Sequence, residues 1–503
     1  MSAEAFEAVE DVDIVIIGAG ISGIGAAAYV SRELPEKSVV VLEARDDIGG
    51  TWDLFRYPGV RSDSDMYTLG YRFRPWTDTR SLADGGSIKS YIADTAREYA
   101  IDRLIRFEQR VVDADWSNED QRWTLRLETA DGEQTITCGF LYMCTGYYDY
   151  DAGYTPELAG IEDFQGQVVH PQHWPEGLDV TDKKVVVVGS GATAVTLVPE
   201  LAKDAGLVTM LQRSPTYVAA VPRIDPIGKA LEGAPSWLSY PVLRWKNVAM
   251  GVGIYQFSRR RPQRMRELLG KGVARFFTDS DFHHRTHFSP TYDPWDQRLC
   301  AVPSGDLFKA IRSGRADVVT DRISRFDETG IVLESGDHLD ADVVVTATGL
   351  NLQLLGGAVL KVDGRELDLA KHYVYKGMAL NDVPNFVLTI GYTNASWTLK
   401  ADLVADYVAR LLGHLRRNGH AAFVPELPAG ADELPSDPLI DLQSGYVRRS
   451  AHLMPRQGAD WPWKLRQNYP VDLVKLRHGP LTDGVRFVPA KSPSSTEREQ
   501  VPA

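Results

Sequence analysis

The chain has 503 residues, of which 44% are hydrophobic and 24% are charged, a composition typical of a soluble globular protein with two or three domains. Its net charge of −13 argues against nucleic acid as a partner, because phosphate binding requires a basic surface. The three cysteines, Cys138, Cys144 and Cys300, form no C-x-x-C pair and no disulfide framework. No apolar run approaches the roughly 20 residues of a membrane span. We therefore expect a cytoplasmic protein without a transmembrane segment.

An apolar strand at 13–17 leads into a glycine-rich turn and then into a helix of small residues. In such a pattern the glycines give a tight turn, close approach of the backbone to a pyrophosphate, and close packing of the helix on the strand. The next strand, at 39–42, ends on a carboxylate that can accept hydrogen bonds from ribose hydroxyls. This predicts a dinucleotide site for NAD or FAD, with a helix N-terminus facing the phosphates. The predicted binding residues are Gly18, Gly20, Gly23 and Glu43.

A second strand, turn and helix begin at 184–188, with alanine in place of the third glycine. The strand that follows, at 207–211, ends beside an arginine instead of an acid. An acid would repel a ribose 2′-phosphate, whereas arginine pairs with it in bidentate geometry, so this second site predicts NADPH. The predicted binding residues are Gly189, Gly191, Thr193, Ala194 and Arg213, with Thr193 as a second contact to the 2′-phosphate.

A short linker between the two turns carries the most specific pattern in the chain, with Phe164, Gly166, His170, Trp174 and Pro175 at fixed spacing. This F-x-G-x-x-x-H-x-x-x-W-P pattern resembles the fingerprint of Baeyer–Villiger monooxygenases, which use FAD and NADPH to insert oxygen beside a carbonyl. The similarity runs from about residue 12 to 487 and is strongest to the actinobacterial branch that includes the ethionamide-activating monooxygenase. We expect His170 to organise the linker between the nucleotide domains and not to act in acid–base catalysis.

The resemblance identifies the first nucleotide as FAD and implies further contacts. Segments 49–52 and 56–63 resemble those that wrap FAD in this family, and segment 391–397 resembles one that leads into a helix whose N-terminus faces the flavin. A strand beginning at 342 ends in an A-T-G motif, which in two-nucleotide flavoproteins returns the chain to the FAD domain. The additional residues expected at the cofactors are Gly50, Thr51, Trp52, Asp63, Thr348, Gly349 and Asn394.

These patterns predict an α/β fold with two Rossmann-like dinucleotide-binding domains, for FAD and NADP, and a helical insertion in the NADP domain. The FAD domain is expected to be discontinuous. The predicted boundaries are 1–147 and 342–490 for the FAD domain, 148–215 (with the linker) and 297–341 for the NADP domain, 216–296 for the insertion, and 491–503 for a disordered tail.

Segment 289–298 resembles the family segment that ends in Lys-Arg, whose arginine is the essential electrostatic residue. We carry this role to Arg298, because a guanidinium keeps its charge near neutral pH and can stabilise both an anionic flavin C4a-peroxide and its anionic adduct with a ketone. Asp63 is expected to orient it. Gln297 stands where many relatives have a lysine that holds the 2′-phosphate, so the preference for NADPH rests mostly on Arg213.

Aromatic and basic residues interleave in segment 237–266, as they do in helices at membrane surfaces. We favour a helical insertion whose apolar face packs inward over the substrate cavity, with transient membrane contact at the inner face of the membrane as the alternative. His283, His284 and His287 have the spacing of metal ligands. No cysteine or clear carboxylate accompanies them, so we expect no metal site.

The sequence thus predicts an NADPH- and O2-dependent monooxygenase that converts ketones to esters or lactones, with thioethers or thioamides as further substrates of the resembling branch. One alternative is an N- or S-hydroxylating flavin monooxygenase, which usually has tyrosine or phenylalanine where this chain has Trp174. A non-catalytic alternative is a flavin-binding sensor. A disulfide reductase is disfavoured, because its redox-active cysteine pair is missing. The natural substrate and the oligomeric state stay open.

Overall fold

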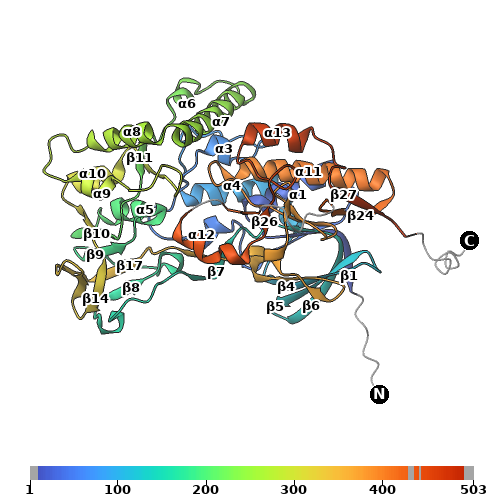
Figure 1. Ribbon diagram of the computed structural model, residues 1–503, viewed down its shortest axis with the longest axis horizontal. Helices are drawn as coiled ribbons and strands as arrows, with labels where there is room; N and C mark the ends of the chain where they lie inside the picture. The colour runs from blue at the N-terminus through green and yellow to red at the C-terminus, as the bar shows by residue number, and fades with distance from the viewer. Residues whose placement is uncertain (1–8, 429–435, 441–442, 492–503) are drawn as a thin grey trace, which may run out of the picture.

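The computed structural model describes residues 9–428, 436–440 and 443–491, which form two α/β units side by side (Figure 1). The first is built on a nine-stranded sheet of β1 (Glu10–Ile17), β2 (Val39–Leu42), β3 (Ile105–Arg106), β4 (Gln109–Ser117), β5 (Arg122–Thr129), β6 (Gly132–Met143), β19 (Val359–Val362), β20 (Arg365–Glu366) and β23 (Phe386–Leu388). Strands from both ends of the chain share this sheet, because β19 pairs with β4 and β23 pairs with β6. The first unit is therefore built from both ends of the chain, as expected for a discontinuous domain.

Within this sheet β3, β2, β1 and β6 are parallel and form the Rossmann half, whereas β4, β5 and β6 form an antiparallel meander. The long α11 (Trp397–Arg417) packs against α1 (Ile21–Glu33) and α13 (Tyr469–Arg477). The other helices of this unit are α2 (Thr51–Leu54), α3 (Met66–Leu69) and α4 (Gly85–Glu98).

The second unit is a parallel five-stranded sheet of β8 (Gln167–Val169), β9 (Lys184–Val188), β10 (Leu207–Gln212), β13 (Ala316–Thr320) and β17 (Val343–Thr346), in the order β13-β10-β9-β17-β8. Its central strands are valine runs buried on both faces. Helices α5 (Ala192–Leu201) and α10 (Asp306–Arg312) pack together beside it. Because β17 pairs with β9, the chain leaves this sheet after Thr346, so the boundary predicted at 342 is too early.

The predicted insertion is mostly helical, with α6 (Pro226–Ala230), α7 (Ser236–Arg260), α8 (Pro262–Ala274) and α9 (His284–Phe288). It begins with β11 (Val218–Val221), which pairs in parallel with β12 (Cys300–Pro303). Helices α6, α7 and α8 lie along one outer edge of the molecule (Figure 1). None of the helices among the described residues is long and apolar enough to span a bilayer.

Short elements complete the chain: an antiparallel sheet of β14 (Ile323–Asp327), β15 (Gly330–Leu333) and β16 (His338–Asp340), the pairs β7 (Tyr148–Gly153) with β18 (Leu350–Leu352), β21 (Val374–Tyr375) with β22 (Ala379–Leu380), β24 (His420–Pro425) with β27 (Val485–Pro489) and β25 (Asp437–Pro438) with β26 (Arg456–Gln457), and α12 (Gly445–Ser450). Apart from Lys491, the predicted disordered tail at 491–503 lies outside the described residues.

Candidate functional site

A cavity of about 450 Å³ lies where α1 and α5 begin, between the two units. Its wall combines the first glycine turn, the end of β2, and the start of α2 with residues of the second unit. The predicted residues that the cavity brings together are Gly18, Gly20, Glu43, Gly50, Thr51, Trp52, Asp63, Thr193 and Arg298. A smaller chamber of about 20 Å³ also has Arg298 in its wall, together with Tyr392, Trp397 and Tyr446.

The first turn has the geometry that its glycines predict. Gly18 has a φ of +102°, and a Cβ there would lie 2.7 Å from the carbonyl oxygen of Cys144. A Cβ on Gly23 would lie 1.8 Å from the carbonyl oxygen of Gly18, so α1 can cross this closely only at a glycine. A Cβ on Gly20 would lie 3.6 Å from its nearest neighbour, Gly50 Cα, which is an ordinary van der Waals contact. The protein itself therefore tolerates a side chain at Gly20, and only a ligand at the turn would exclude it.

The carboxylate of Glu43 is buried on the cavity wall. Its Oε2 accepts a hydrogen bond from Ala19 N at 2.7 Å, and its Oε1 accepts one from Arg45 N at 3.0 Å. Burial raises the pKa of Glu43, against the effect of these two amides. A carboxylate has about four acceptor sites, so two are left for the hydroxyls of a ribose.

The start of α2 is held by an ion-pair cluster that the sequence did not indicate. Asp53, buried behind Trp52, accepts hydrogen bonds from Arg45 Nε at 3.1 Å and from Lys89 Nζ at 2.6 Å. Arg45 itself lines the cavity. Gly49 and Gly50 have positive φ values, so the chain can turn here to place the Thr51 amide at the helix start. Contacts within the protein therefore hold the segment that is predicted to wrap the flavin.

Arg298 and Asp63 meet on the cavity wall, with Arg298 Nε 3.4 Å from Asp63 Oδ2. The negative charge of Asp63 is the largest influence on the guanidinium and raises the pKa of Arg298, against the effect of burial. Arg298 is therefore a permanent cation here. Although its side chain is partly solvent-accessible, that accessible surface faces the cavity.

Three tyrosines surround this cation, and the sequence analysis missed all of them: Tyr147, Tyr148 and Tyr446. Burial raises the pKa of each phenol, that of Tyr148 to about 12, so all three stay neutral. No spacing in the sequence relates them to Arg298, because Tyr446 comes from α12, Tyr148 begins β7 and Tyr147 directly precedes it. Trp397 also lines the cavity and donates from Nε1 to Ser22 Oγ at 2.7 Å.

The fingerprint segment lies at the edge of the second sheet, where its β8 pairs with β17. Gly166 packs against Phe164 and the carbonyl oxygen of Asp342, which a Cβ would approach to 2.6 Å. The His170 ring packs on Gly153, and its Nδ1 accepts a hydrogen bond from Gln172 N at 3.2 Å. Burial lowers the pKa of His170. Trp174 and Pro175 are half-buried, and Trp174 packs on the core of the second unit.

Gln172, which the sequence analysis overlooked, ties this linker to β7. It is buried, and its Nε2 donates to the carbonyl oxygens of Asp149 at 2.9 Å and Tyr150 at 3.1 Å. Since Tyr150 also contacts Thr51 across the cavity, the linker is connected to the first unit through one strand.

The second turn also has the predicted backbone. Gly189 has a φ of +141°, and a Cβ there would lie 2.3 Å from the carbonyl oxygen of Ala347. Gly191 precedes α5 and faces open space, and Ala194 is fully buried. Arg213 is exposed after β10, and no carboxylate among the described residues forms a salt bridge with it. Ser190 joins the turn to the Arg213 segment through Thr216 Oγ1 at 2.8 Å.

Some predicted residues lie elsewhere than expected. Thr193 faces the central cavity, next to the hydroxyl of Tyr57, and Arg213 is not in that wall, so a contact from both to one 2′-phosphate is not supported. Thr348 donates from Oγ1 to the carbonyl oxygen of Tyr154 at 2.6 Å, beside Gly349 with its φ of +121°. Asn394 donates from Nδ2 to the carbonyl oxygen of Gln467 at 2.9 Å. These residues shape the backbone and lie outside the cavity wall.

The insertion does not cover the cavity as we expected. Residues 216–296 are all described, and none of them lines either chamber. The inner face of α7 packs on α3 and α11 instead. His287 is a packing residue, with Nδ1 2.8 Å from Thr320 Oγ1, and no group of three potential metal ligands occurs within the described part of the chain.

Comparison with known proteins relates this arrangement to flavoproteins. Residues 16–78 match the family described as NAD(P)-binding Rossmann-like domain, and residues 73–231 match the family described as flavin-binding monooxygenase-like. The FAD-containing monooxygenase EthA of Mycobacterium tuberculosis is 51% identical over 488 residues, which cover 96% of this chain and 99% of that protein. The probable FAD-binding monooxygenase AlmA of Acinetobacter baylyi is 47% identical over 495 residues, 98% of each chain.

Solved structures share the fold at lower identity. An oxidised steroid monooxygenase bound to NADP aligns with a TM-score of 0.74 and 23% identity, over 96% of this chain and 100% of its own. The cyclohexanone monooxygenase from Rhodococcus sp. Phi1 bound to NADP+ aligns with a TM-score of 0.73 and 19% identity, with the same coverage.

Proposed function

This chain belongs to the family of flavin-binding monooxygenases, and on that premise we propose that it binds FAD and NADPH and oxygenates ketones to esters or lactones. The family membership confirms the resemblance read from the sequence. The observation that supports ketone oxygenation is the Arg298–Asp63 pair, whose Nε and Oδ2 atoms are 3.4 Å apart. This pair lies in the wall of the cavity, together with the first glycine turn.

The residues of the cavity fit FAD. A Cβ on Gly20 would meet no protein atom closer than 3.6 Å, so the backbone at the start of α1 is open to a ligand. The N-cap residue of α1 offers no side-chain hydrogen bond to the free amides of the helix. Glu43 keeps acceptor sites for the hydroxyls of a ribose. These residues would hold the pyrophosphate and the ribose, with Thr51 and Trp52 alongside. Gly189, Gly191 and the N-terminus of α5 would hold the pyrophosphate of NADPH. Arg213, which forms no salt bridge with any described carboxylate, would bind its 2′-phosphate.

The reaction balances as ketone, O2, NADPH and H+ giving ester, NADP+ and water. When bound, FAD takes the hydride of NADPH and delivers one oxygen atom of O2 to the substrate. Arg298 stabilises the negative charge that develops on the ketone oxygen as that atom is added. Asp63 keeps the guanidinium in place, and the phenols of Tyr147, Tyr148 and Tyr446 near the cation stay neutral. His170, with its lowered pKa, organises the linker and transfers no proton.

The proposal is tested by Arg298→Ala. Removal of one preorganised cation from such a site typically costs about 3–4 kcal/mol, a factor of roughly 10²–10³ in ester formation. Hydride transfer from NADPH creates no oxyanion on the substrate, so flavin reduction in a stopped-flow experiment should change by less than about tenfold. The variant should therefore consume NADPH and release hydrogen peroxide in place of ester. Sulfoxide formation from a thioether should fall less, because no carbonyl oxyanion forms.

Two variants control for general damage. Arg315→Ala removes an exposed arginine that is not part of the cavity wall and should leave every rate unchanged. Asp63→Asn keeps the cation and loses its partner, so it should reduce ester formation by a smaller factor than Arg298→Ala. If Arg298→Ala forms ester near the wild-type rate, Arg298 is not the electrostatic centre. If the wild type forms sulfoxide and no ester with any ketone, the enzyme is an S-oxygenase.

A further inference from the structure

The outer face of α7 exposes apolar side chains to solvent from Trp237 to Phe257. Trp237 is 76% exposed, Met250 53% and Trp245 49%. The exposed apolar side chains of this helix are Trp237, Leu238, Val242, Trp245, Met250, Ile254 and Phe257. The 25 residues of α7 include no aspartate or glutamate. A monomeric soluble protein rarely leaves such a patch without a partner.

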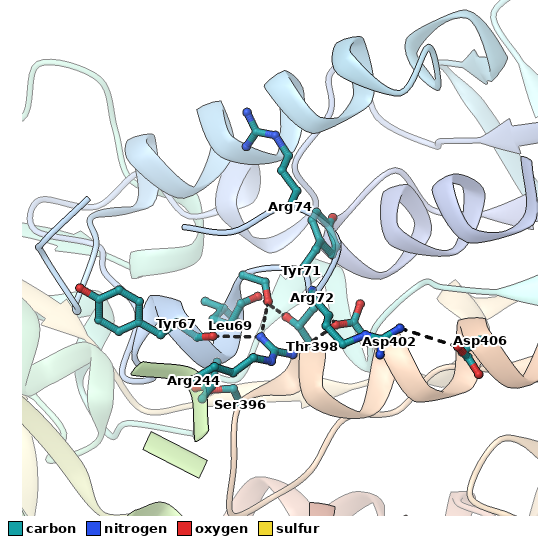
Figure 2. A network of polar contacts seen from close by, with 12 residues as sticks. Tyr67, Leu69, Tyr71, Arg72, Arg74, Arg244, Ser396, Thr398, Asp402 and Asp406 are labelled. Atoms are coloured by element: carbon teal, nitrogen blue, oxygen red, sulfur yellow. Dashed lines mark hydrogen bonds and ion pairs between the residues drawn. The ribbon is translucent and has the colours of Figure 1, made fainter. Parts of the chain in front are cut away.

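Buried contacts fix which face of α7 points outward. Arg244 donates from Nη1 to the carbonyl oxygens of Tyr67 and Gly70, both at 2.9 Å, and its Nη2 lies 3.3 Å from Asp402 Oδ2 (Figure 2). Tyr240, one turn earlier, donates to the carbonyl oxygen of Tyr71 at 2.9 Å. If the helix rotated to bury its apolar face, the Arg244 cation would lose these partners. The exposed face is therefore a stable property of the fold.

The neighbouring α8 adds positive charge to this edge of the molecule. Arg264, Leu268, Lys271 and Arg275 follow helical spacing on one exposed face. Arg260 and Arg261, at the junction of the two helices, are exposed as well. Glu267 is the single acidic residue of the segment 236–275, although the whole chain carries a net charge of −13. We call the exposed residues of α7 and α8 the α7–α8 surface.

We propose that the α7–α8 surface docks on a lipid bilayer that contains anionic headgroups. Tryptophan rings prefer the boundary between headgroups and acyl chains, and an apolar helix flanked by arginines lies in that boundary. The basic residues attract anionic headgroups, and each adds about fivefold to partitioning. A second copy of this chain fits less well, because a two-fold contact would place the basic residues of both copies against each other.

Ion pairs connect the α7–α8 surface to the loop that carries Arg298. Arg259, at the end of α7, pairs with Asp296 at 2.7 Å, and Arg266 of α8 pairs with Asp293 at 2.6 Å. Both carboxylates belong to the loop that carries Arg298. The surface that would contact the bilayer is therefore bonded directly to the loop of the candidate active site.

The test is co-sedimentation of the purified full-length, FAD-loaded protein with vesicles of phosphatidylcholine alone or mixed with phosphatidylglycerol, without NADPH or substrate. We expect binding to the anionic vesicles that is at least about tenfold tighter and weakens as salt rises. Replacing Trp237, Leu238 and Val242 by glutamine should weaken binding to both vesicles by about tenfold or more. Replacing Arg260, Arg261 and Arg264 by glutamine should weaken binding to anionic vesicles by about 10²-fold.

Matched controls separate this surface from general effects. Leu453→Gln with Val474→Gln removes exposed apolar side chains elsewhere, and Arg103→Gln, Lys309→Gln and Arg315→Gln together remove the same charge elsewhere. These controls should bind as the wild type does. The proposal is overturned if the wild type binds neither vesicle, or if the controls lose as much binding as the surface variants. It is also overturned if the wild type forms a dimer in ultracentrifugation that the apolar variant does not form, and the wild type does not bind vesicles. Because no turnover is involved, the outcome is independent of the oxygenation proposal.

Discussion

Replacing Arg244 with methionine should destabilise the protein by an amount that grows with pH. Arg244 of α7 and Asp402 of α11 form an ion pair in which each side chain is only 6% exposed, so methionine would leave a buried carboxylate without its cation (Figure 2). Removal of one partner from a buried pair costs about 3–5 kcal/mol. The variant also leaves the carbonyl oxygens of Tyr67 and Gly70 without a donor.

The pH dependence follows from Asp402. Burial raises its pKa to about 6 even though Arg244 and the Arg72 amide favour the charged form. An unfolded aspartate titrates near 3.9, so charging this buried carboxyl lowers the stability of the folded state as pH rises from about 4 to about 6. Without Arg244 the pKa of Asp402 rises further, and each added unit costs about 1.4 kcal/mol at higher pH. We therefore expect the full loss at pH 8 and a clearly smaller loss at pH 5.

The assay is urea unfolding of the FAD-loaded protein at pH 5 and pH 8, followed by tryptophan fluorescence and by release of flavin. Arg264→Met makes the same chemical change on an exposed helix face and should alter neither midpoint. In an Asp402→Asn background, Arg244→Met should cost less and should lose its dependence on pH. An equal loss at both pH values, unchanged by Asp402→Asn, would refute the reasoning.

Two further predictions concern the cofactors. Arg213→Ala should raise the Michaelis constant for NADPH by roughly tenfold to a hundredfold and leave that for NADH nearly unchanged, because one charge-assisted phosphate contact is lost; equal effects on both cofactors would show that Arg213 does not bind the 2′-phosphate. Gly20→Ala should fold normally, since its Cβ meets only an ordinary contact, yet retain less FAD by absorbance, whereas Gly23→Ala should misfold because its Cβ overlaps the Gly18 oxygen. A Gly20→Ala protein with full flavin content would contradict the role of this turn.

The sequence predicts the parallel strands well because they are buried on both faces. Such strands appear as continuous apolar runs, and β2 and β9 begin and end at the predicted residues. The glycine turns could also be predicted from the sequence. Gly18, Gly23 and Gly189 each have a backbone conformation or a close contact that a side chain would prevent. These features depend on neighbours in the chain or on backbone geometry, so one sequence is enough to indicate them.

The orientation of α7 could not be predicted in this way. Its apolar residues occur around the whole helix, so the pattern does not distinguish an inward from an outward face. That choice depends on Asp402, which is 158 residues from Arg244 and carries no local signal of the pairing. Our expectation that the apolar face covers the cavity was wrong for this reason.

Arg298 illustrates the limit of sequence reasoning at the site itself. Its loop has no regular structure and is positioned by contacts from distant segments, among them Arg259 with Asp296, Arg266 with Asp293, and Gln443 N with the carbonyl oxygen of Asp296 at 2.8 Å. The first two come from α7 and α8 and the third from the segment before α12. Because residues from three parts of the chain place one loop, spacing cannot reveal the Arg298–Asp63 pair, and only the resemblance could identify it. The same contacts imply that a change in the position of α7 or α8 is transmitted to the loop that carries the cation.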